Sequence, residues 1–524
     1  MSILDPRPLL LSPDLSESEV ARLLTPYGFT DWKKADANLQ LMAGDPRSRN
    51  LLASILQDLL SAVSHTADPD HALNEWERYL DAGNARAQVF SFLSQTPHIL
   101  ELVCVLFGNS PAMAETLIRD PMLLYWLEDE HILKSRPTKK RLYILLDDAL
   151  GVIKSYERKL DALRRFHRRE MLRIGARDMF RVATVQETYQ SLSQLAEIVI
   201  HAAYHIVSED LQKQHGIPFH KNSKGKLQQT GFVIIGMGKL GKELNYSSDV
   251  DLVYVYDSSL GHTKTGNKQK CLSNEVYFQH LARTLTRVLS NSTSEGSLFR
   301  VDLRLRPEGS VGSLAWAVSD AVKYYQTRGR AWERLAFLKA RPIAGDLKVG
   351  KNFLWKIRPF VMGQEDDAPK KIVEAVRSLR TQIHQKVKRK GEQDRNVKLS
   401  PGGIRDIEFI IQTLQLIHVG LEPQLFESNT LKSLKLLIDR QHVLADQGKK
   451  LKDCYLYLRD VEHKLQMVNE LQTHTLPIQE NEILKCAIRM GHDPRTLQGN
   501  PAPFLTKYRS ITSQVQELFT MLLF

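Results

Sequence analysis

The sequence predicts a predominantly α-helical α+β protein in three parts: an N-terminal helical region (1–208), a mixed α/β core (209–350) and a C-terminal helical bundle (351–524). Apolar residues recur at three- and four-residue spacing from about Leu39 through the first part, which is the spacing of amphipathic helices. The same spacing returns from about Phe353 and continues to the end of the chain. The middle part differs, because its short apolar runs bounded by glycine or aspartate are typical of buried strands.

The elements of the middle part follow a polar connector, "QKQHGIPFHKNSKGKLQQT". The runs "GFVIIG" and "DVDLVYVYD" are rich in β-branched and aromatic residues, so each predicts a strand. "VYFQHLARTLTRVL" has helical periodicity, and "SLFRVDLRLRP" alternates apolar and polar residues with the period of a strand. Strands, a glycine-rich turn and helices mixed in this way predict one α/β or α+β core.

The composition restricts the class of protein. With 524 residues the chain is too long for one hydrophobic core. Its four cysteines lie far apart without a C-x-x-C pair, which argues against a zinc site or a disulfide scaffold and favours a reducing cytoplasm. No apolar run is long enough for a membrane span. The net charge of +12 suits anionic partners such as nucleotides, nucleic acid or an acidic protein surface.

Two carboxylates stand at the start of the second predicted strand. Asp249 and Asp251 are two residues apart, so they point to the same side of a strand, with Cα atoms roughly 6–7 Å apart. Mg²⁺ prefers oxygen ligands and often joins one or two carboxylates to substrate phosphates. Asp302, in "FRVDLRLRP", lies on the polar face of the next predicted strand, a face that also holds Arg300, Arg304 and Arg306. Carboxylates on this pattern can hold two metal ions for displacement at phosphorus.

A glycine-rich turn precedes these aspartates. "GMGKLG" follows the first strand, allows close backbone approach and presents free N–H groups to an anion. Lys239 adds a point charge for phosphate, and Ser247 and Ser248 add hydroxyl groups beside the aspartates. The P-loop pattern is absent. G-x-G-x-x-G is satisfied literally, but D-x-D arrives within a dozen residues, too early for the ribose-binding acid of a dinucleotide fold.

From these residues alone, plainer interpretations stay open. The D-x-D pair is also typical of a solvated strand end, and Asp302 could simply pair with Arg304 or Arg306. The glycine turn could be an ordinary strand-to-helix connection.

The order of motifs resembles a known family. A glycine turn, D-x-D on a strand and a later aspartate resemble the active-site signature of DNA polymerase β-like nucleotidyltransferases. "GMGKLGKELNYSSDVDL", "RVDLRLRPEGSVG", "WERLAFLKARPIAGD", "SPGGIRDIEFIIQ" and "YLRDVEHKLQMVNELQTHTLP" resemble the glutamine synthetase adenylyltransferase/adenylyl-removing family, the glutamate-ammonia-ligase adenylyltransferases. The resemblance runs from about residue 85 to the end of the chain. It implies a polymerase β-like core flanked by helical regions.

The resemblance also implies an activity. Family members usually carry two tandem units, one removing AMP from a tyrosine of glutamine synthetase and one adding it. This sequence holds one D-x-D unit, and the residues of its motifs resemble the N-terminal, adenylyl-removing half more closely than the other half. The implied reaction is phosphorolysis, in which phosphate releases the AMP as ADP. The turn "KLGKEL" is one residue shorter than the common double-glycine version of the family.

Roles for individual residues follow from the resemblance. Asp249, Asp251 and Asp302 would be the catalytic residues and the ligands of Mg²⁺, with two ions expected. The expected phosphate and nucleotide ligands are Gly238, Lys239, Gly241, Ser248, Arg304 and Arg306. ATP or ADP would be substrate or product, glutamine synthetase the protein substrate and a PII-type signal protein a possible partner. Arg405, Asp406 and Glu408 either close over the site or form ion pairs between domains.

Three rival functions remain on the sequence. One is ATP-dependent adenylyl addition to glutamine synthetase or to another substrate. A second is nucleotidyl transfer to RNA or a small molecule, which the lack of an aromatic-rich basic patch disfavours. The third is a regulatory binding scaffold with a vestigial site, which the presence of all three aspartates disfavours.

Overall fold

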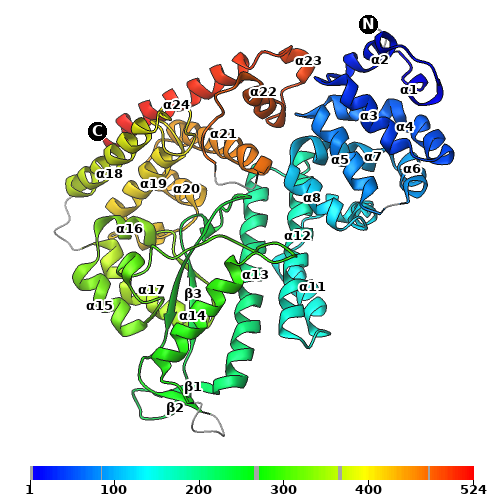
Figure 1. Cartoon of the computed structure of the whole chain (residues 1–524). Helices are drawn as coiled ribbons and strands as arrows, with labels where there is room; N and C mark the ends of the chain where they lie inside the picture. Colours follow the sequence, from blue (N-terminus) through cyan, green and yellow to red (C-terminus); the bar gives the residue numbers. More distant parts are fainter. Residues whose placement is uncertain (1–3, 84, 265–270, 364–368, 470–472) are drawn as a thin grey trace. The chain divides into compact units, whose positions relative to one another are not determined.

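The computed structural model describes the chain apart from residues 1–3, 84, 265–270, 364–368 and 470–472. It is predominantly helical with small mixed sheets, which confirms the predicted α+β class (Figure 1). The chain forms two compact units. Unit 1 comprises Met1–Arg136, Arg168–Thr188 and Arg459–Ser510, and unit 2 comprises Pro137–His167, Tyr189–Leu458 and Ile511–Phe524.

The chain passes between the two units five times, once between Arg136 and Pro137 and otherwise inside four helices. These are α12 (Tyr156–Met179), α13 (Val185–His215), α21 (Ala445–Asn469) and α24 (Ala502–Leu523). The units are therefore assembled from separated stretches of sequence. The division at residues 208 and 350 follows composition along the chain and stays a prediction.

Unit 1 is built from short helices whose starts are fixed by local chemistry. Its N-terminal helices are α1 (Pro8–Leu11), α2 (Glu17–Leu24), α3 (Trp32–Ala43), α4 (Pro46–Ser64), α5 (Pro69–Asp81), α6 (Arg86–Gln95), α7 (Pro97–Asn109), α8 (Pro111–Arg119), α9 (Leu123–Leu127) and α10 (Glu130–Lys134). Asp45, Asp68 and Ser110 cap α4, α5 and α8, and each is followed by proline at the first helical position.

The core of unit 1 centres on the buried side chain of Trp76. Its ring packs edge-on against Phe107, with ring centroids 5.1 Å apart, and its Nε1–H lies 3.3 Å from the Cys104 sulfur. Later segments of the chain complete the unit. They include α22 (Glu480–Arg489) and α23 (Pro494–Leu497), and Lys485 on α22 pairs with the Asp68 carboxylate at 2.7 Å.

Unit 2 contains the predicted strands and two sheets. A five-stranded sheet has the order β6-β4-β3-β8, with β7 also pairing with β4. Its strands are β3 (Phe232–Gly236), β4 (Val250–Tyr256), β6 (Val301–Asp302), β7 (Ala315–Ala317) and β8 (Arg341–Gly345). β3 is antiparallel to β4 and β8, whereas β6 and β7 run parallel to β4.

Helices cover both faces of this sheet. On α14 (Asn274–Ser290), the ring of Phe278 stacks on Phe232 and Tyr256, which are register partners on β3 and β4. On the opposite face, α17 (Leu347–Met362) approaches Val233 so closely that a Cβ at Gly350 would lie 2.8 Å from the valine. The strand that carries Asp251 at its start, β4, therefore belongs to a sheet that is covered by helices on both faces.

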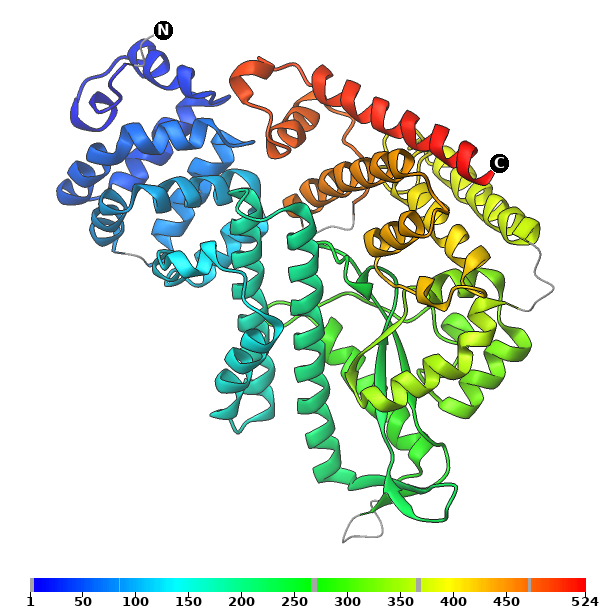
Figure 2. The ribbon, with the colours of Figure 1, turned by 180° about the vertical axis from the view of Figure 1, so that it is seen from behind.

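Two sequence expectations need correction here. The predicted long strand over "SLFRVDLRLRP" is limited to Val301–Asp302, and the chain turns directly afterwards. The polar connector contains strands, since β1 (Ile217–Lys221) pairs with β2 (Leu227–Gln229) and with β5 (His262–Lys264) in a second sheet. Figure 2 shows α13 leading directly into this small sheet. Its strands are mostly exposed, so they lack the apolar signal of β3 and β4.

The rest of unit 2 is helical, as predicted. Its other helices are α11 (Lys139–Gly151), α15 (Val318–Arg328), α16 (Ala331–Phe337), α18 (Pro369–Arg389), α19 (Ile404–His418) and α20 (Thr430–Asp439). Arg380 on α18 lies over the ring of Phe519 on α24 at 4.0 Å from its centroid. The same guanidinium pairs with Asp406 on α19 at 2.7 Å, which ties three helices together.

Within the described ranges no single helix has the length and apolar character needed to cross a membrane. α6 and α7 together reach that length, but the chain bends by 115° between them. The cytoplasmic location stays a prediction.

Candidate functional site

Two of the three predicted aspartates are direct neighbours across the sheet. Asp251 is the second residue of β4 and Asp302 ends β6, and the two are register partners on adjacent parallel strands. Asp249 immediately precedes β4. Side chains of register partners share one face of a sheet. The structure thus brings together the aspartates that the sequence placed on separate strands.

Asp251 carries the strongest electrostatic signal of the site. Burial raises the pKa of Asp251 to about 6, and the nearby negative charges of Asp302 and Asp249 act in the same direction. Lys398 and Arg405 oppose this rise. Within the part of the chain that the structure describes, the Asp251 carboxylate receives no hydrogen bond and no ion pair. A buried carboxylate beside two like charges is suited to a cation.

The other two aspartates are held by arginines. The Arg300 Nε–H donates to Asp249 Oδ1 at 2.9 Å, and the Arg300 guanidinium also reaches the Ser247 hydroxyl and carbonyl oxygens. Arg304 donates hydrogen bonds to the Asp302 carboxylate oxygens from its backbone N–H at 2.8 Å and from its guanidinium group at 2.5–3.1 Å. Burial alone would raise the pKa of Asp302, but these bonds from Arg304 outweigh it and lower the pKa.

These pairings determine how the carboxylates are arranged. Over the described ranges, no group of three or more histidine, cysteine, aspartate or glutamate side chains is arranged as a metal site. Two of the three carboxylates face arginines instead. For all three carboxylates to bind a cation, Asp249 and Asp302 would have to exchange their arginine partners for the ion.

The glycine turn packs directly against Asp251. β3 ends at Gly236, and the short 3-10 helix η2 (Gly238–Gly241) follows. Gly238 has φ +54°, and a Cβ there would lie 2.6 Å from Asp251 Oδ2. A side chain at this position would displace the carboxylate, so the glycine is required for the site as well as for the turn.

The residue that follows the glycine turn has a backbone conformation that is unusual for its type. Lys242, directly after η2, has φ +102° and ψ +24°, a left-handed conformation that glycine adopts readily and other residues adopt at a cost. The chain therefore has a glycine-like backbone at a lysine.

The strain at Lys242 predicts a measurable gain on substitution. We expect Lys242→Gly to raise the free energy of unfolding by about 0.5–1 kcal/mol, because relief of the left-handed strain exceeds the added entropy of the unfolded chain. Chemical denaturation would measure it. Lys242→Ala is the matched control, since it removes the charge and keeps the Cβ. An equal gain in both variants would assign the effect to charge instead of backbone strain.

The predicted phosphate ligands differ in what they already bind. Lys239 lies half-buried in η2, and Ser248 accepts a hydrogen bond from the Asn245 backbone at 3.3 Å. The side chain of Arg304 is 78% exposed beyond its pairing with Asp302. Gly241 packs against the Lys339 carbonyl oxygen, which a Cβ would meet at 3.0 Å. Phosphate binding by each of them stays a prediction.

Arg306 is committed to the backbone. Its buried guanidinium donates to four carbonyl oxygens at 2.8–3.1 Å, those of Leu303, Ser310, Gly312 and Ser313. These bonds fold the segment after β6 into turns, which explains why the predicted strand stops at Asp302. The predicted phosphate contact of Arg306 is untested, and its donors serve the loop in this structure.

A buried ion network that the sequence reasoning missed supports the glycine turn. The Lys339 ammonium lies 2.8 Å from Glu408 and 3.2 Å from Glu243, and all three side chains are buried. Glu243 also accepts hydrogen bonds from the backbone N–H and the hydroxyl of Thr430, the first residue of α20. A carboxylate at a helix N-terminus is favourable. The turn that carries Gly238 is thus fixed to the helical part of unit 2.

The pKa values in this network agree with permanent charges. Burial alone would lower the pKa of Lys339, but Glu243 and Glu408 outweigh it and raise the pKa. For Glu408, burial opposes ionisation, and the charges of Lys339 and Arg405 nevertheless hold its pKa below the usual range. A buried lysine between two glutamates therefore stays charged at neutral pH.

The "GGIRDIEF" segment forms ion pairs within the predicted C-terminal bundle, and Glu408 also pairs with Lys339 of the predicted core, which is a pair between the predicted domains. Asp406 pairs with Arg380, and burial of Asp406 is outweighed by bonds from His384 and Arg380, which lower its pKa. Arg405 lies 3.2 Å from Glu408. The sequence signal for Lys339 was a lone lysine within the apolar stretch "LAFLKARPIAG".

Comparison with known proteins gives matches to two family models and to relatives that share one name. Residues 100–356 match the family model for glutamate-ammonia ligase adenylyltransferase, and residues 377–523 match the model for GlnD PII-uridylyltransferase. Three curated relatives share one name, "Bifunctional glutamine synthetase adenylyltransferase/adenylyl-removing enzyme". The protein from Nitrosococcus oceani is 40% identical over 394 residues, 75% of this chain and 40% of that protein.

Two further relatives agree. The Hahella chejuensis protein is 35% identical over 418 residues and the Rhizobium meliloti protein 36% identical over 424, each match covering 79% of this chain and 42% of the relative. The chain spans about two-fifths of the length of these relatives. The aspartate-bearing strands, the glycine turn and the match across residues 100–356 agree, and the chain belongs to the glutamate-ammonia ligase adenylyltransferase family of nucleotidyltransferases.

Proposed function

We propose that this chain regulates glutamine synthetase by removing AMP from a modified tyrosine through phosphorolysis. The observation that carries the proposal is the pairing of Asp251 with Asp302 beside the Gly238 turn. The names of the relatives supply adenylyl removal as one of two activities. The residues of the motifs resemble the adenylyl-removing half more closely, which favours this direction.

The proposed reaction balances without a further reactant. An oxygen of hydrogen phosphate attacks the phosphorus of the AMP–tyrosine diester, and the bond from phosphorus to the phenolic oxygen breaks. The proton carried by the phosphate passes to the leaving phenolate. The products are ADP and unmodified tyrosine. Such reactions depend mainly on positioning and electrostatic stabilisation.

The donor set fits Mg²⁺. Asp249, Asp251 and Asp302 supply only carboxylate oxygens, the ligands this ion prefers, and the like charges around Asp251 favour a cation. When bound, Mg²⁺ would neutralise charge on the phosphate oxygens. Gly238 keeps the Asp251 carboxylate in place by leaving room for it.

The remaining residues would position the phosphates. The exposed guanidinium of Arg304 can pair with phosphate oxygens once Asp302 turns away from it. Lys239 in η2 offers a point charge, and Ser248 offers a hydroxyl beside Asp249. Arg300 would pair with the Asp249 carboxylate as long as no cation is bound.

A PII-type signal protein is the proposed regulatory partner. The support is the match of residues 377–523 to the PII-uridylyltransferase model, whose name includes PII. A pull-down with purified PII-type protein, with and without ATP, would measure binding to this chain. Absence of binding in both conditions would remove the partner and leave the catalytic proposal in place.

The direction of the reaction can be measured directly. We expect the chain, incubated with adenylylated glutamine synthetase, Mg²⁺ and phosphate, to release ADP, and a parallel reaction with unmodified enzyme and ATP to incorporate no AMP. AMP incorporation instead would support the transfer direction. The Asp249→Asn/Asp251→Asn double variant is the negative control. If wild type and this variant behave alike in both reactions, the proposal is wrong.

A further inference from the structure

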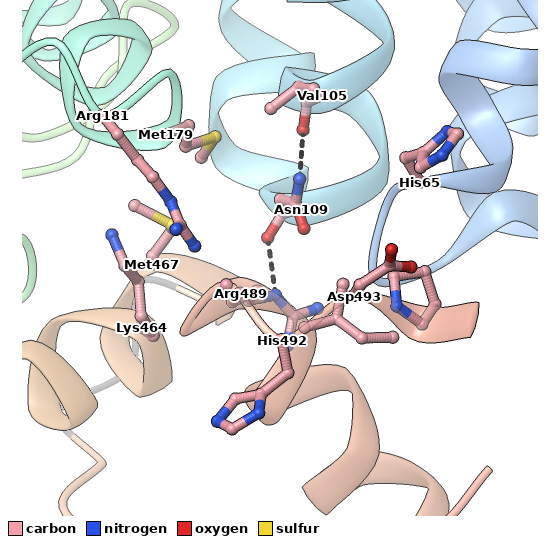
Figure 3. A pocket seen from close by; sticks show the side chains of 13 residues that line it. His65, Val105, Asn109, Met179, Arg181, Lys464, Met467, Arg489, His492 and Asp493 are labelled. Carbon is pink, nitrogen blue, oxygen red and sulfur yellow. Dashed lines mark hydrogen bonds between the residues drawn. The ribbon is translucent and has the colours of Figure 1, made fainter. Parts of the chain in front are cut away.

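Unit 1 contains a cavity of about 320 Å³. The residues of the candidate catalytic site belong to unit 2 and to other parts of the sequence. It is lined by the end of α4, by α7, by the end of α12, by α21 and by α22 with the loop that follows it (Figure 3). Cavities that bind small molecules are typically of this size or somewhat larger, with apolar walls and a few polar groups.

Arg489 lies in the wall of this cavity. Its Nε–H donates to the Asn109 carbonyl oxygen at 3.1 Å, which fixes the plane of the guanidinium. Among the described residues, its terminal nitrogens have no hydrogen-bond acceptor and no carboxylate within 4 Å. Burial lowers the pKa of Arg489, and Cys486, Glu482 and Asp68 act in the opposite direction. Both of those carboxylates already pair with Lys485.

Arg181 reaches the same cavity from the end of α12. Figure 3 shows its side chain extending toward Lys464 and Arg489. No carboxylate within the described ranges lies within 4 Å of its guanidinium, and its side chain makes no hydrogen bond there. It lies against Gly491, where a Cβ would be 1.3 Å from its Nη2. The glycine therefore leaves the room that Arg181 occupies.

The other charges around the cavity are already neutralised. Lys464 pairs with Asp178 at 2.9 Å and with Asp460 at 3.7 Å. Asp493, the single carboxylate among the lining residues, pairs with Arg495 at 3.2 Å. Arg181 and Arg489 differ from these residues, because among the described residues no carboxylate lies within 4 Å of either guanidinium group. Their donor groups match the oxygens of carboxylates and phosphates.

His492 lies beside the cavity and is affected by the charges around it. Burial lowers the pKa of His492, and the positive charges of Lys507 and Arg181 lower it further. Its imidazole is directed away from Arg489 in Figure 3, so it shapes the surroundings and is not aimed at the space between the arginines. The apolar part of the wall is formed by Val105, Met179, Met467 and Ile488.

We propose that this cavity binds a small organic anion, with a carboxylate or phosphate group between Arg181 and Arg489 and an apolar body against Met179, Met467 and Ile488. The volume limits the occupant to a small molecule, which excludes a peptide or a nucleic acid chain. This site is separate from the proposed catalysis, and its ligand would be bound by unit 1.

Calorimetry on the full chain tests the proposal with two probes. Citrate represents carboxylates and glycerol 3-phosphate represents phosphates, each titrated to about 10 mM. We expect at least one probe to bind with one site per chain. Arg181→Gln should weaken this binding about 10- to 100-fold, the loss of one charge-assisted pair. Because the Arg181 side chain makes no hydrogen bond within the described residues, this variant should fold normally.

Control variants separate the outcomes. Arg22→Gln, an exposed arginine of the same unit, should leave probe binding unchanged. The Asp249→Asn/Asp251→Asn variant should also keep it, which distinguishes this cavity from the catalytic site. Arg489→Lys retains a charge and should weaken binding less than Arg489→Gln. Binding of neither probe, or full binding in both Arg181→Gln and Arg489→Gln, would overturn the proposal.

Discussion

Replacing Asp251 with asparagine is expected to lower kcat for ADP release by on the order of 10³-fold, because a metal-binding carboxylate contributes several kcal/mol to charge stabilisation. Asparagine keeps the size of the side chain and leaves the Gly238 turn undisturbed. The loss should therefore fall on kcat, and KM for adenylylated glutamine synthetase should change little. Steady-state kinetics at saturating Mg²⁺ would measure both.

The same substitution should make the protein more stable when divalent cations are absent. The pKa of Asp251 is raised from 3.8 to about 6, so the folded protein binds this proton more tightly than the unfolded chain. The free energy of unfolding therefore falls between these two pH values and stays lower above them. At pH 7 the buried charge costs about 2–3 kcal/mol, part of which asparagine removes. The melting temperature should rise by a few degrees.

Magnesium should reverse that order. Mg²⁺ that binds the folded wild type raises its melting temperature by mass action, whereas Asp251→Asn should respond weakly. Asp147→Asn, an exposed aspartate on α11 of the same unit, is the control and should match wild type in activity and melting. If Asp251→Asn retains activity, or melts lower than wild type in EDTA, Asp251 is not a buried cation ligand.

The second large effect is expected at Lys339. Lys339→Met leaves Glu243 and Glu408 buried without their shared counterion, a change that costs about 3–5 kcal/mol. Because Glu243 also anchors the start of α20, the loss should loosen the glycine turn and lower kcat. Thermal melting and the ADP-release assay would measure the two consequences.

Matched variants make the Lys339 result specific. Lys348→Met changes an exposed lysine on α17 and should leave the melting temperature nearly unchanged. Lys339→Met combined with Glu243→Gln and Glu408→Gln removes the uncompensated charges and should recover part of the stability. Equal melting temperatures for Lys339→Met and wild type would show that the network contributes little.

The sequence was sufficient for the elements with a strong local pattern. β3, β4 and α14 form where apolar periodicity placed them, because each is packed on at least one full face. Asp249 and Asp251 could be identified from one strand. Their meeting with Asp302 required the parallel register of β4 and β6, which local spacing does not encode.

Elements and contacts that depend on distant partners were not predictable in the same way. β6 stops after two residues because Arg306 binds the backbone of the following turns, and no period in the sequence records those bonds. The sequence around Lys339 does not show that it forms a buried ion pair. Its partners Glu243 and Glu408 come from distant segments, one before it and one after it in the chain. The αL backbone at Lys242 is likewise visible only in three dimensions.

The repeated passage of the chain between its units affects the order in which the protein can fold during synthesis. Asp178 and the Asn109 carbonyl emerge from the ribosome long before their partners Lys464 and Arg489. Unit 1 therefore stays unfinished until residues 459–510 are made, by which time most of unit 2 is already available for folding. A nascent chain that ends before this segment exposes the surface that Lys464 and Arg489 later cover.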